Sequence, residues 1–250
     1  MPYLKEASVI LLAYIFGSIP FGLLIVKLTT GKDIRQVASG RTGGTNAMRA
    51  AGLGAGVLTA VMDVLKGACS VWMAQAVVPN NPWLHILAPI ATIIGHNYSI
   101  FLAERNEEGR IRLRGGAGGG PTLGGAVGLW WPSIFIILPI GVVLFWGVGY
   151  ASITTIGVAL IAIVIFSIRY FDGLSAGQNV LYGVIAALLL VWALRPNLAA
   201  LIEGRERFHG WRPWRKKVEE PPKVESVSVP KPVHRHKKGG STKLIKSKTR

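Results

Sequence analysis

The chain has 250 residues, half of them apolar and only 16% charged, and its mean hydropathy is +0.42. Soluble domains carry about 25% charged residues, so this composition excludes a soluble one-domain enzyme, a collagen and a disulfide scaffold. The formal charge of +16 is uneven, because residues 1–202 hold 13 basic and 7 acidic side chains and residues 203–250 hold 15 and 5. The sequence therefore divides into an apolar body and a basic tail.

Apolar runs that can cross a bilayer recur along the body, since a hydrocarbon core of about 30 Å needs roughly 20 helical residues. The first run is 7–26. A signal peptide is the competing interpretation, but no small-x-small cleavage site follows, so a retained helix kinked at Pro20 is predicted. The later predicted spans are 57–78, 83–102, 122–131, 132–150, 153–168 and 180–194.

The run 122–131 is short, because ten helical residues rise only about 15 Å. The loops after the first and third spans are rich in Lys and Arg, and this places both in the cytoplasm. The basic tail favours the same side, which requires that 122–131 be counted. The expected fold is an all-α polytopic membrane protein with seven transmembrane helices, its N-terminus outside and its C-terminus cytoplasmic. A re-entrant loop at 115–131 is the alternative.

The predicted membrane domain covers residues 1–206, and a disordered basic tail follows at 207–250. The tail combines prolines with like charges, which prevents a packed core. Each Lys or Arg near an anionic bilayer surface is worth about 1 kcal/mol, so the tail is expected on the anionic leaflet.

A polar loop follows the first span and reads SGRTGGTN over 39–46, with Arg49 three residues further on. Successive glycines let backbone N–H groups converge on an anion, and an arginine offers a planar fork to a phosphate. The pattern is neither a Walker A motif nor a dinucleotide fingerprint. A flexible loop with a helix cap at Thr45 or Asn46 is the other interpretation.

A second loop holds seven glycines within residues 115–125. Such a run indicates either a backbone that approaches a ligand or helices that pack tightly through small residues. The arginines before it alternate with glutamates, so a solvated loop is expected over 104–114.

Four further polar residues lie in or beside predicted spans. Asp63 and Lys66 share a helix face and are predicted to pair or to serve a site. His96 is expected to be a structural hydrogen bonder or a site residue, and no metal site is predicted. Ser152, taken alone, is a helix cap.

These segments together resemble the bacterial acyl-phosphate:glycerol-3-phosphate acyltransferase family. The matching pieces are GSIPFG at 17–22, SGRTGGTNAMR at 39–49, DVLKG at 63–67, GHNY at 95–98, GG at 115–116, YAS at 150–152, RPNL at 195–198 and GRE at 204–206. The order and spacing of these pieces extend across residues 10–206.

The resemblance implies a multi-pass enzyme of the bacterial inner membrane that transfers an acyl chain from acyl phosphate to glycerol 3-phosphate. The products are lysophosphatidic acid and phosphate, with no cofactor, metal or nucleic acid involved. The residues implied as catalytic are Ser39, Thr45, Arg49 and Ser152. Those implied to contact substrate are Gly40, Arg41, Gly43, Gly44, Asn46, Lys66, His96, Gly115, Gly116, Arg195, Asn197 and Glu206.

Three positions depart from the family pattern. Ala117 stands where the family usually has Lys, Leu194 where it has His, and Arg41 where it has Asn. Arg114, Arg112 or Arg41 is hypothesised to supply the missing cation.

Other functions stay open at this point. A transporter of a phosphorylated solute also uses broken helices and polar loops. A non-catalytic relative of the acyltransferase, or a membrane anchor with a basic tail, would share the same composition.

Overall fold

The computed structural model of the chain describes residues 3–105 and 108–209. The chain divides into two units, Met1–Trp211 and Arg212–Arg250, and the second lies outside the described residues. The longer helices of the first unit are α1 (Leu4–Ser18), α2 (Phe21–Thr30), α4 (Leu53–Val77), α5 (Pro82–Asn97), α6 (Gly119–Leu129), α7 (Ile134–Val143), α8 (Ala151–Phe171) and α9 (Gly177–Ala193). Shorter elements are η1 (Ile34–Gln36), α3 (Gly44–Ala51), η2 (Trp131–Ser133), the π-helical η3 (Leu144–Val148), α10 (Arg195–Ile202) and the strands β1 (Ser99–Arg105) and β2 (Ile111–Arg114).

Four helical segments are long and apolar enough to cross a membrane. They are Leu4–Thr30, Leu53–Val77, Trp131–Val148 and Ala151–Phe171, and a fifth is added if α9 and α10, bent by 66°, count as one span. The helix α8 is longer than the predicted run 153–168, since it extends from residue 151 to residue 171. The described part of the chain is thus mostly helical, as predicted, and carries four to five candidate spans.

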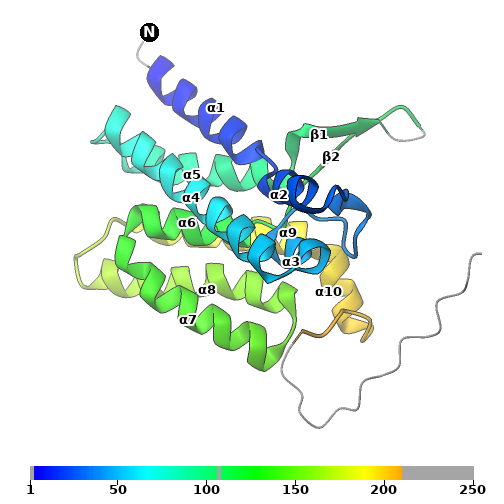
Figure 1. The fold of residues 1–250 in the computed structure, drawn as a ribbon. Coiled ribbons are helices and arrows are strands. Elements are labelled where there is room, and N and C mark those ends of the chain that lie inside the picture. The colour runs from blue at the N-terminus through cyan, green and yellow to red at the C-terminus, as the bar shows by residue number, and fades with distance from the viewer. Residues whose placement is uncertain (1–2, 106–107, 210–250) are drawn as a thin grey trace, which may run out of the picture. The chain divides into compact units, whose positions relative to one another are not determined.

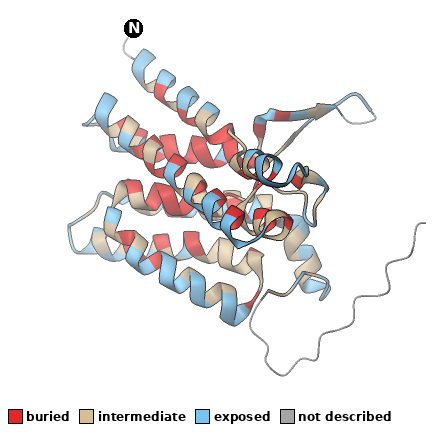
Figure 2. Ribbon diagram, viewed as in Figure 1, coloured by how far each residue is buried: buried red, intermediate tan, exposed pale blue. Residues whose placement is uncertain are grey.

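The helix α6 lies at the centre of the unit, where it packs against α4, α5, α8 and α9 (Figure 1). Seven of its eleven residues are buried, and the buried colour in Figure 2 gathers on α4, α5 and α6. Because its neighbours cover it, this short helix does not need to match the bilayer thickness by itself. Compared with the predicted run 122–131, this helix begins earlier, at Gly119, and ends earlier, at Leu129.

Small residues let the helices of this core approach closely. A Cβ at Gly17 would collide with the backbone of Thr92, and a Cβ at Gly95 would collide with the backbone of Tyr14, so α1 and α5 touch along their axes. A Cβ at Gly124 would meet the carbonyl oxygen of Val64, which holds α6 against α4 in the same way. Glycine at these positions is typical of helices packed inside a membrane.

The first predicted span breaks between α1 and α2. Ile19 is extended, with φ −61° and ψ 117°, as expected for a residue that precedes a proline. Pro20 has no N–H to continue the ladder, so the helix restarts at Phe21.

The predicted end of the third span, at residue 102, was wrong, because α5 ends at Asn97. Residues 99–105 form β1, which pairs antiparallel with β2 through Glu104↔Arg112 and Arg105↔Ile111. The solvated loop expected over 104–114 is therefore largely a hairpin that projects from the helices (Figure 1). The Glu104 carboxylate lies 2.7 Å from Arg35 and 3.1 Å from Arg114, so the ion pair with Arg35 joins the hairpin to the first polar loop.

The chain after α10 was also assigned too early to the tail. Phe208 forms an isolated bridge with Tyr150, and the His209 N–H donates to the Gly149 oxygen at 2.7 Å. Residues 207–209 thus pack on the helical unit, whereas 210–250 lie outside the described residues.

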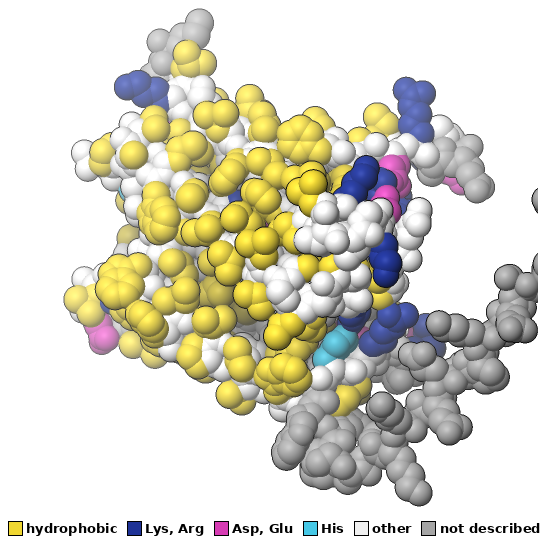
Figure 3. Space-filling view, viewed as in Figure 1, with side chains coloured by type: hydrophobic (Ala, Val, Ile, Leu, Met, Phe, Trp, Pro, Cys, Tyr) yellow, Lys and Arg dark blue, Asp and Glu magenta, His cyan; other side chains and the backbone are white. Residues whose placement is uncertain are grey.

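Figure 3 shows apolar side chains covering the visible flank of the helices, while Lys and Arg side chains gather at the end that bears the hairpin. The loops that hold the predicted site residues lie at this end.

Candidate functional site

The first polar loop is shaped by Asn46. Its Nδ2 lies 3.1 Å from the oxygen of Ile34, 2.9 Å from that of Val37 and 2.8 Å from that of Arg41. The side chain is 2% exposed, and Gly40 turns the chain with φ +67°. Asn46 therefore holds the loop in one conformation by satisfying its carbonyl groups.

The helix-cap interpretation of this loop was wrong. The helix α3 begins at Gly44 with Gly43 as its N-cap residue, and no side chain caps it. Gly44 instead lies against the carbonyl oxygen of Gly56 on α4. Thr45 is half-buried in the first turn of α3.

Arg41 connects three segments that are distant in the sequence. Its Nη1 donates to the Gly116 oxygen at 3.1 Å, and its Nη2 donates to the Ala193 oxygen at 2.6 Å and to Asn197 Oδ1 at 3.2 Å. All three acceptors are neutral, and no described carboxylate lies within ion-pair distance of the guanidinium. Burial lowers the pKa of Arg41 from its ordinary value, yet an arginine stays charged in a protein.

The second glycine loop lies directly on the end of α5. The Gly116 N–H donates to the His96 oxygen at 2.8 Å, and a Cβ at Gly116 would collide with the His96 ring. A Cβ at Gly115 would collide with the same carbonyl oxygen. The sequence left open whether this run approaches a ligand or packs tightly, and at these two glycines the backbone packs on protein.

Asn97 belongs to the GHNY piece noted in the sequence but was given no role in the predicted site. It is 5% exposed, and neither its Oδ1 nor its Nδ2 has a hydrogen-bond partner among the described residues. Its amide lies against Gly118, the left-handed N-cap residue of α6. The available signal was a polar residue that follows His96 at the end of an apolar run.

A buried charged cluster lies beneath the second loop. Lys66 Nζ is 2.9 Å from Asp63 Oδ1 and 2.7 Å from His96 Nδ1, and it also donates to the Ile19 oxygen at 3.3 Å. The pairing of Asp63 with Lys66 matches the modest interpretation of their spacing. The sequence did not predict that His96 joins them.

Ser152 is not a helix cap, since Tyr150 takes the N-cap position of α8. The Ser152 hydroxyl donates to Glu206 at 2.6 Å, and its N–H donates to the same carboxylate at 3.3 Å. The Glu206 carboxylate therefore lies at the positive end of the α8 dipole, where a negative charge is favoured.

Arg49 contacts His209, a residue that sequence reasoning also missed. Burial lowers the pKa of both side chains, and in each case the nearby cationic groups lower it further. His209 stacks near Phe145 at 5.6 Å between ring centroids. We call residues 205–209 the C-terminal strap, because this segment joins Arg49 to the start of α8.

Two predicted residues are not drawn into these contacts. Ser39 is exposed, and its Oγ accepts from the Arg41 N–H at 3.4 Å. Arg195 is exposed and stacks on Trp192 with 3.4 Å from its Cζ to the ring centroid.

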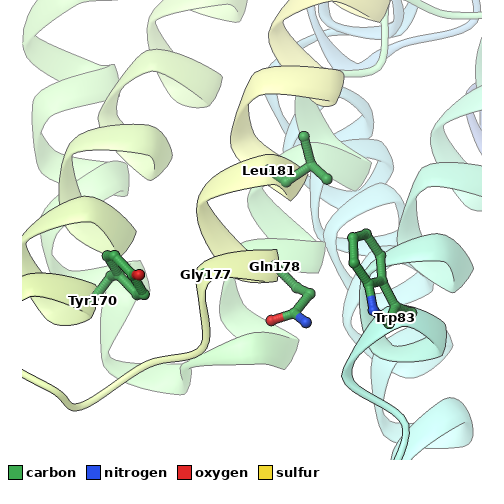
Figure 4. A pocket seen from close by; sticks show the side chains of 5 residues that line it. All are labelled: Trp83, Tyr170, Gly177, Gln178 and Leu181. Carbon is green, nitrogen blue, oxygen red and sulfur yellow. The ribbon is translucent and has the colours of Figure 1, made fainter.

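Two hollows of the unit lie away from the polar loops. One of about 360 Å³ is lined by Trp83, Tyr170, Gly177, Gln178 and Leu181 (Figure 4), at the opposite ends of α5, α8 and α9 from the polar loops. The other, also about 360 Å³, is an apolar groove between α7 and α8. No group of three metal-ligating side chains that could hold an ion occurs within 3–105 and 108–209.

Comparisons with known proteins agree with the resemblance seen in the sequence. A family model described as glycerol-3-phosphate acyltransferase matches residues 7–204. A glycerol-3-phosphate acyltransferase of Rubrobacter xylanophilus is 36% identical over 213 residues, covering 83% of this chain and 96% of the relative. A glycerol-3-phosphate acyltransferase of Thermus thermophilus is 35% identical over 212 residues and covers 81% and 94%.

Solved structures agree as well. The crystal structure of PlsY (YgiH), an integral membrane glycerol 3-phosphate acyltransferase in its glycerol 3-phosphate form, superposes with a TM-score of 0.69 at 28% identity, covering 82% of this chain and 96% of that one. Its lysophosphatidic acid form gives a TM-score of 0.66 at 26% identity, with 81% and 94% covered. The sequence-based assignment is thereby confirmed, and the chain belongs to the glycerol-3-phosphate acyltransferase family.

Proposed function

We propose that this chain transfers an acyl chain from acyl phosphate to the hydroxyl group of glycerol 3-phosphate at the polar end of the helical unit. The observation that carries the proposal is the convergence on Arg41 of the first loop, the second loop and Asn197. A cation whose described partners are all neutral retains its charge for an anionic ligand, and both substrates carry a phosphate.

The chemistry requires positioning more than a dedicated nucleophile. The glycerol oxygen attacks the carbonyl carbon, the bond from that carbon to the phosphate oxygen breaks, and phosphate leaves with the electron pair and receives the hydroxyl proton. Negative charge develops on the carbonyl oxygen and the leaving group. Fixed donors such as the Arg41 guanidinium stabilise such charge without reorganisation.

Arg41 is the best placed of the three candidates for the missing cation. Its Nη1 contacts Gly116, which directly precedes the alanine at position 117. Arg114 is paired with Glu104, and Arg112 is exposed on the hairpin. We therefore assign the compensation to Arg41.

The remaining assignments keep their places around this cation. Arg49 and Ser152 are proposed to act at the strap, where Glu206 and His209 hold them. Ser39 and Thr45 stay proposed as catalytic. The residues that stay proposed to contact substrate are Gly40, Gly43, Gly44, Gly115, Gly116, Arg195 and Asn197. Asn46, Lys66 and His96 are instead proposed to support the two loops without touching substrate, because all three side chains are buried and bonded to protein.

The decisive experiment supplies purified full-length chain in detergent with a long-chain acyl phosphate and labelled glycerol 3-phosphate. Lysophosphatidic acid and phosphate are expected in equal amounts. A transporter of a phosphorylated solute or a non-catalytic relative would yield neither, since detergent removes the compartments that transport needs.

The proposed topology is seven spans with the N-terminus outside and the polar end in the cytoplasm of a bacterium, in its inner membrane. It is supported by the gathering of both polar loops, the hairpin and the strap at one end of the helices. In a Cys69→Ser background, an impermeant maleimide should label Asp172→Cys from outside and Glu108→Cys only after permeabilisation. The reverse labelling pattern would show that the chain has the opposite orientation in the membrane.

The basic tail is proposed to lie on anionic lipid. Deleting residues 218–250 should weaken association with anionic vesicles, because each basic side chain at the surface contributes about 1 kcal/mol. Catalysis in neutral detergent should be unchanged, and its loss would contradict the proposed independence of the two parts.

A further inference from the structure

The buried cluster of Asp63, Lys66 and His96 has no direct part in the proposed reaction. Lys66 is 0% exposed, Asp63 is 3% and His96 is 5%. A substrate cannot touch these side chains without displacing the protein around them. Ionised groups in the interior of a membrane protein are costly and mark a role that apolar residues do not fill.

The His96 ring lies between the two charged groups, with its Nδ1 atom 2.7 Å from Lys66 Nζ and 3.5 Å from Asp63 Oδ1. An ammonium group offers three donors and no acceptor, so beside a charged Lys66 the Nδ1 atom accepts. The ring proton is then on Nε2, the atom that lies against Gly116. Asp63 in turn neutralises Lys66 at 2.9 Å.

The second loop rests on this cluster along its length. Gly115 and Gly116 lie against the His96 carbonyl group and ring, and a Cβ at Gly120 would come within 2.7 Å of Asp63 Cβ. The Gly116 N–H donates to the His96 oxygen at 2.8 Å. The glycines let the loop follow the surface that the cluster provides.

The same loop holds the proposed phosphate ligand. The Gly116 oxygen accepts from Arg41 Nη1 at 3.1 Å, and the Gly115 oxygen accepts from the Thr42 N–H at 3.4 Å. Thus two bonds join the first loop to the backbone that His96 supports.

We propose that Asp63, Lys66 and His96 are positioning residues that place the Arg41 guanidinium, through the 115–116 backbone, for the phosphate of glycerol 3-phosphate. The inference rests on the proposed role of Arg41. Packing alone does not explain the cluster, since a buried ion pair can often be replaced by apolar residues of similar volume without loss of stability.

The first test replaces the ion pair by apolar residues of matching shape in the double variant Asp63→Leu/Lys66→Met. Its thermal midpoint in detergent should stay close to that of the native protein. The KM and the calorimetric Kd for glycerol 3-phosphate should rise about tenfold or more, because a loop displaced by a fraction of an ångström misplaces the guanidinium. A folded variant with native KM and Kd would overturn the inference.

Ser70→Ala is the matched control on the same helix. The Ser70 hydroxyl is buried and bonds only to the Gly67 oxygen of α4, at 2.7 Å. Its loss removes a buried polar group without touching the second loop, so KM and Kd should stay unchanged.

The second test leaves the Asp63–Lys66 pair intact and changes only the ring. His96→Asn keeps an acceptor near the position of Nδ1, whereas His96→Leu keeps the volume and removes the acceptor. Positioning predicts that the asparagine variant retains several-fold more kcat/KM and tighter glycerol 3-phosphate binding than the leucine variant. Equal values, or better binding by His96→Leu, would show that the ring acts by packing alone.

Arg41→Gln, measured beside these variants, separates the two proposals. If Arg41→Gln weakens glycerol 3-phosphate binding and the cluster variants do not, only the positioning inference fails. If Arg41→Gln leaves binding unchanged, Arg41 does not hold the phosphate of glycerol 3-phosphate and the positioning inference fails, whereas the proposed function fails only if the native protein forms no lysophosphatidic acid. Because calorimetry measures binding without turnover, this result does not depend on the acyl donor.

Discussion

Lys66 and Arg41 lie at the same end of the helical unit, yet their charges are satisfied in opposite ways. Lys66 is fully buried and has a carboxylate at 2.9 Å and an imidazole at 2.7 Å. Arg41 is half-buried and donates only to two carbonyl oxygens and an amide oxygen. Among residues 3–105 and 108–209, a carboxylate compensates the charge of Lys66 and none compensates that of Arg41.

The two charges therefore have different expected roles, since that of Lys66 orders the protein around it and that of Arg41 is available to a ligand. A compensated interior charge imposes directions on its neighbours and costs stability when one partner is removed. A charge held only by neutral dipoles retains most of its attraction for an incoming phosphate. The variants below test whether the two positions respond as this division requires.

The largest effect on stability is expected where a buried charge loses its oppositely charged partner. Lys66→Met removes the partner of Asp63 and leaves a carboxylate beside apolar atoms, so unfolding should become easier by about 3–5 kcal/mol. Denaturation in mixed micelles measures it. Lys32→Met, at an exposed position, is the control and should stay within about 0.5 kcal/mol. A Lys66→Met protein as stable as the control would mean that Asp63 is not charged.

Arg41→Gln should lower stability by about 1–3 kcal/mol, because buried acceptors lose their donor, and should remove most of the activity. Loss of one preorganised donor to developing charge costs about 100- to 1000-fold in kcat. The matched variant is Arg35→Gln in the same loop, whose guanidinium is already paired with Asp33 and Glu104 at 2.7 Å each. Initial rates of lysophosphatidic acid formation are measured for both variants. Equal losses would show that pairing with a carboxylate does not decide whether an arginine of this loop serves activity.

The sequence predicted the local features of this fold well. The kink at Pro20 and the pairing of Asp63 with Lys66 follow from rules that span four residues or fewer. The glycine run at 115–125 indicated a close approach of backbone. Its partner, the ring of His96, could not be chosen from spacing alone.

The contacts that build the site are long-range, and the sequence was silent on them. Arg41 meets Asn197 across 156 positions, and Ser152 meets Glu206 across 54. Residues 99–105 were read as the end of a span and the start of a loop, because an apolar run of that length does not distinguish a helix end from an edge strand. Within the strap, Glu206 was a predicted site residue, whereas residues 207–209 were assigned to the tail because they follow the last piece of the family pattern.

Glu206 provides a smaller test at the strap. Glu206→Gln keeps the shape but loses the charge that accepts from Ser152 at 2.6 Å, so kcat/KM should fall about tenfold, the cost of a charged hydrogen bond. Glu203→Gln, whose carboxylate pairs with Arg205 at the surface, is the control and should be silent. A tenfold loss in both would indicate a general effect of charge at this end.

The smallest effect is expected from pH at His209. Burial lowers the pKa of this imidazole from about 6.5, and Arg49 lowers it further, against the opposing influence of Glu206 and of the backbone bonds to Gly149 and Arg207. The docked ring is therefore neutral at a pH where the undocked ring is protonated. Docking of the strap is fully favoured above the ordinary pKa and weakens as pH falls through it, when His209 and Arg49 would both be cationic.

Hydrogen exchange of the 205–209 amides measures this opening, since the His209 N–H is bonded to the Gly149 oxygen at 2.7 Å. After correction for intrinsic exchange, protection should fall several-fold between pH 7.5 and pH 5.5, and lysophosphatidic acid formation should fall with it if the strap orders Arg49. His209→Gln cannot be protonated and should show a flat profile for protection. A native protein whose protection does not change with pH, or a glutamine variant that loses protection in parallel with it, would assign the strap to Glu206 and Phe208 rather than to His209.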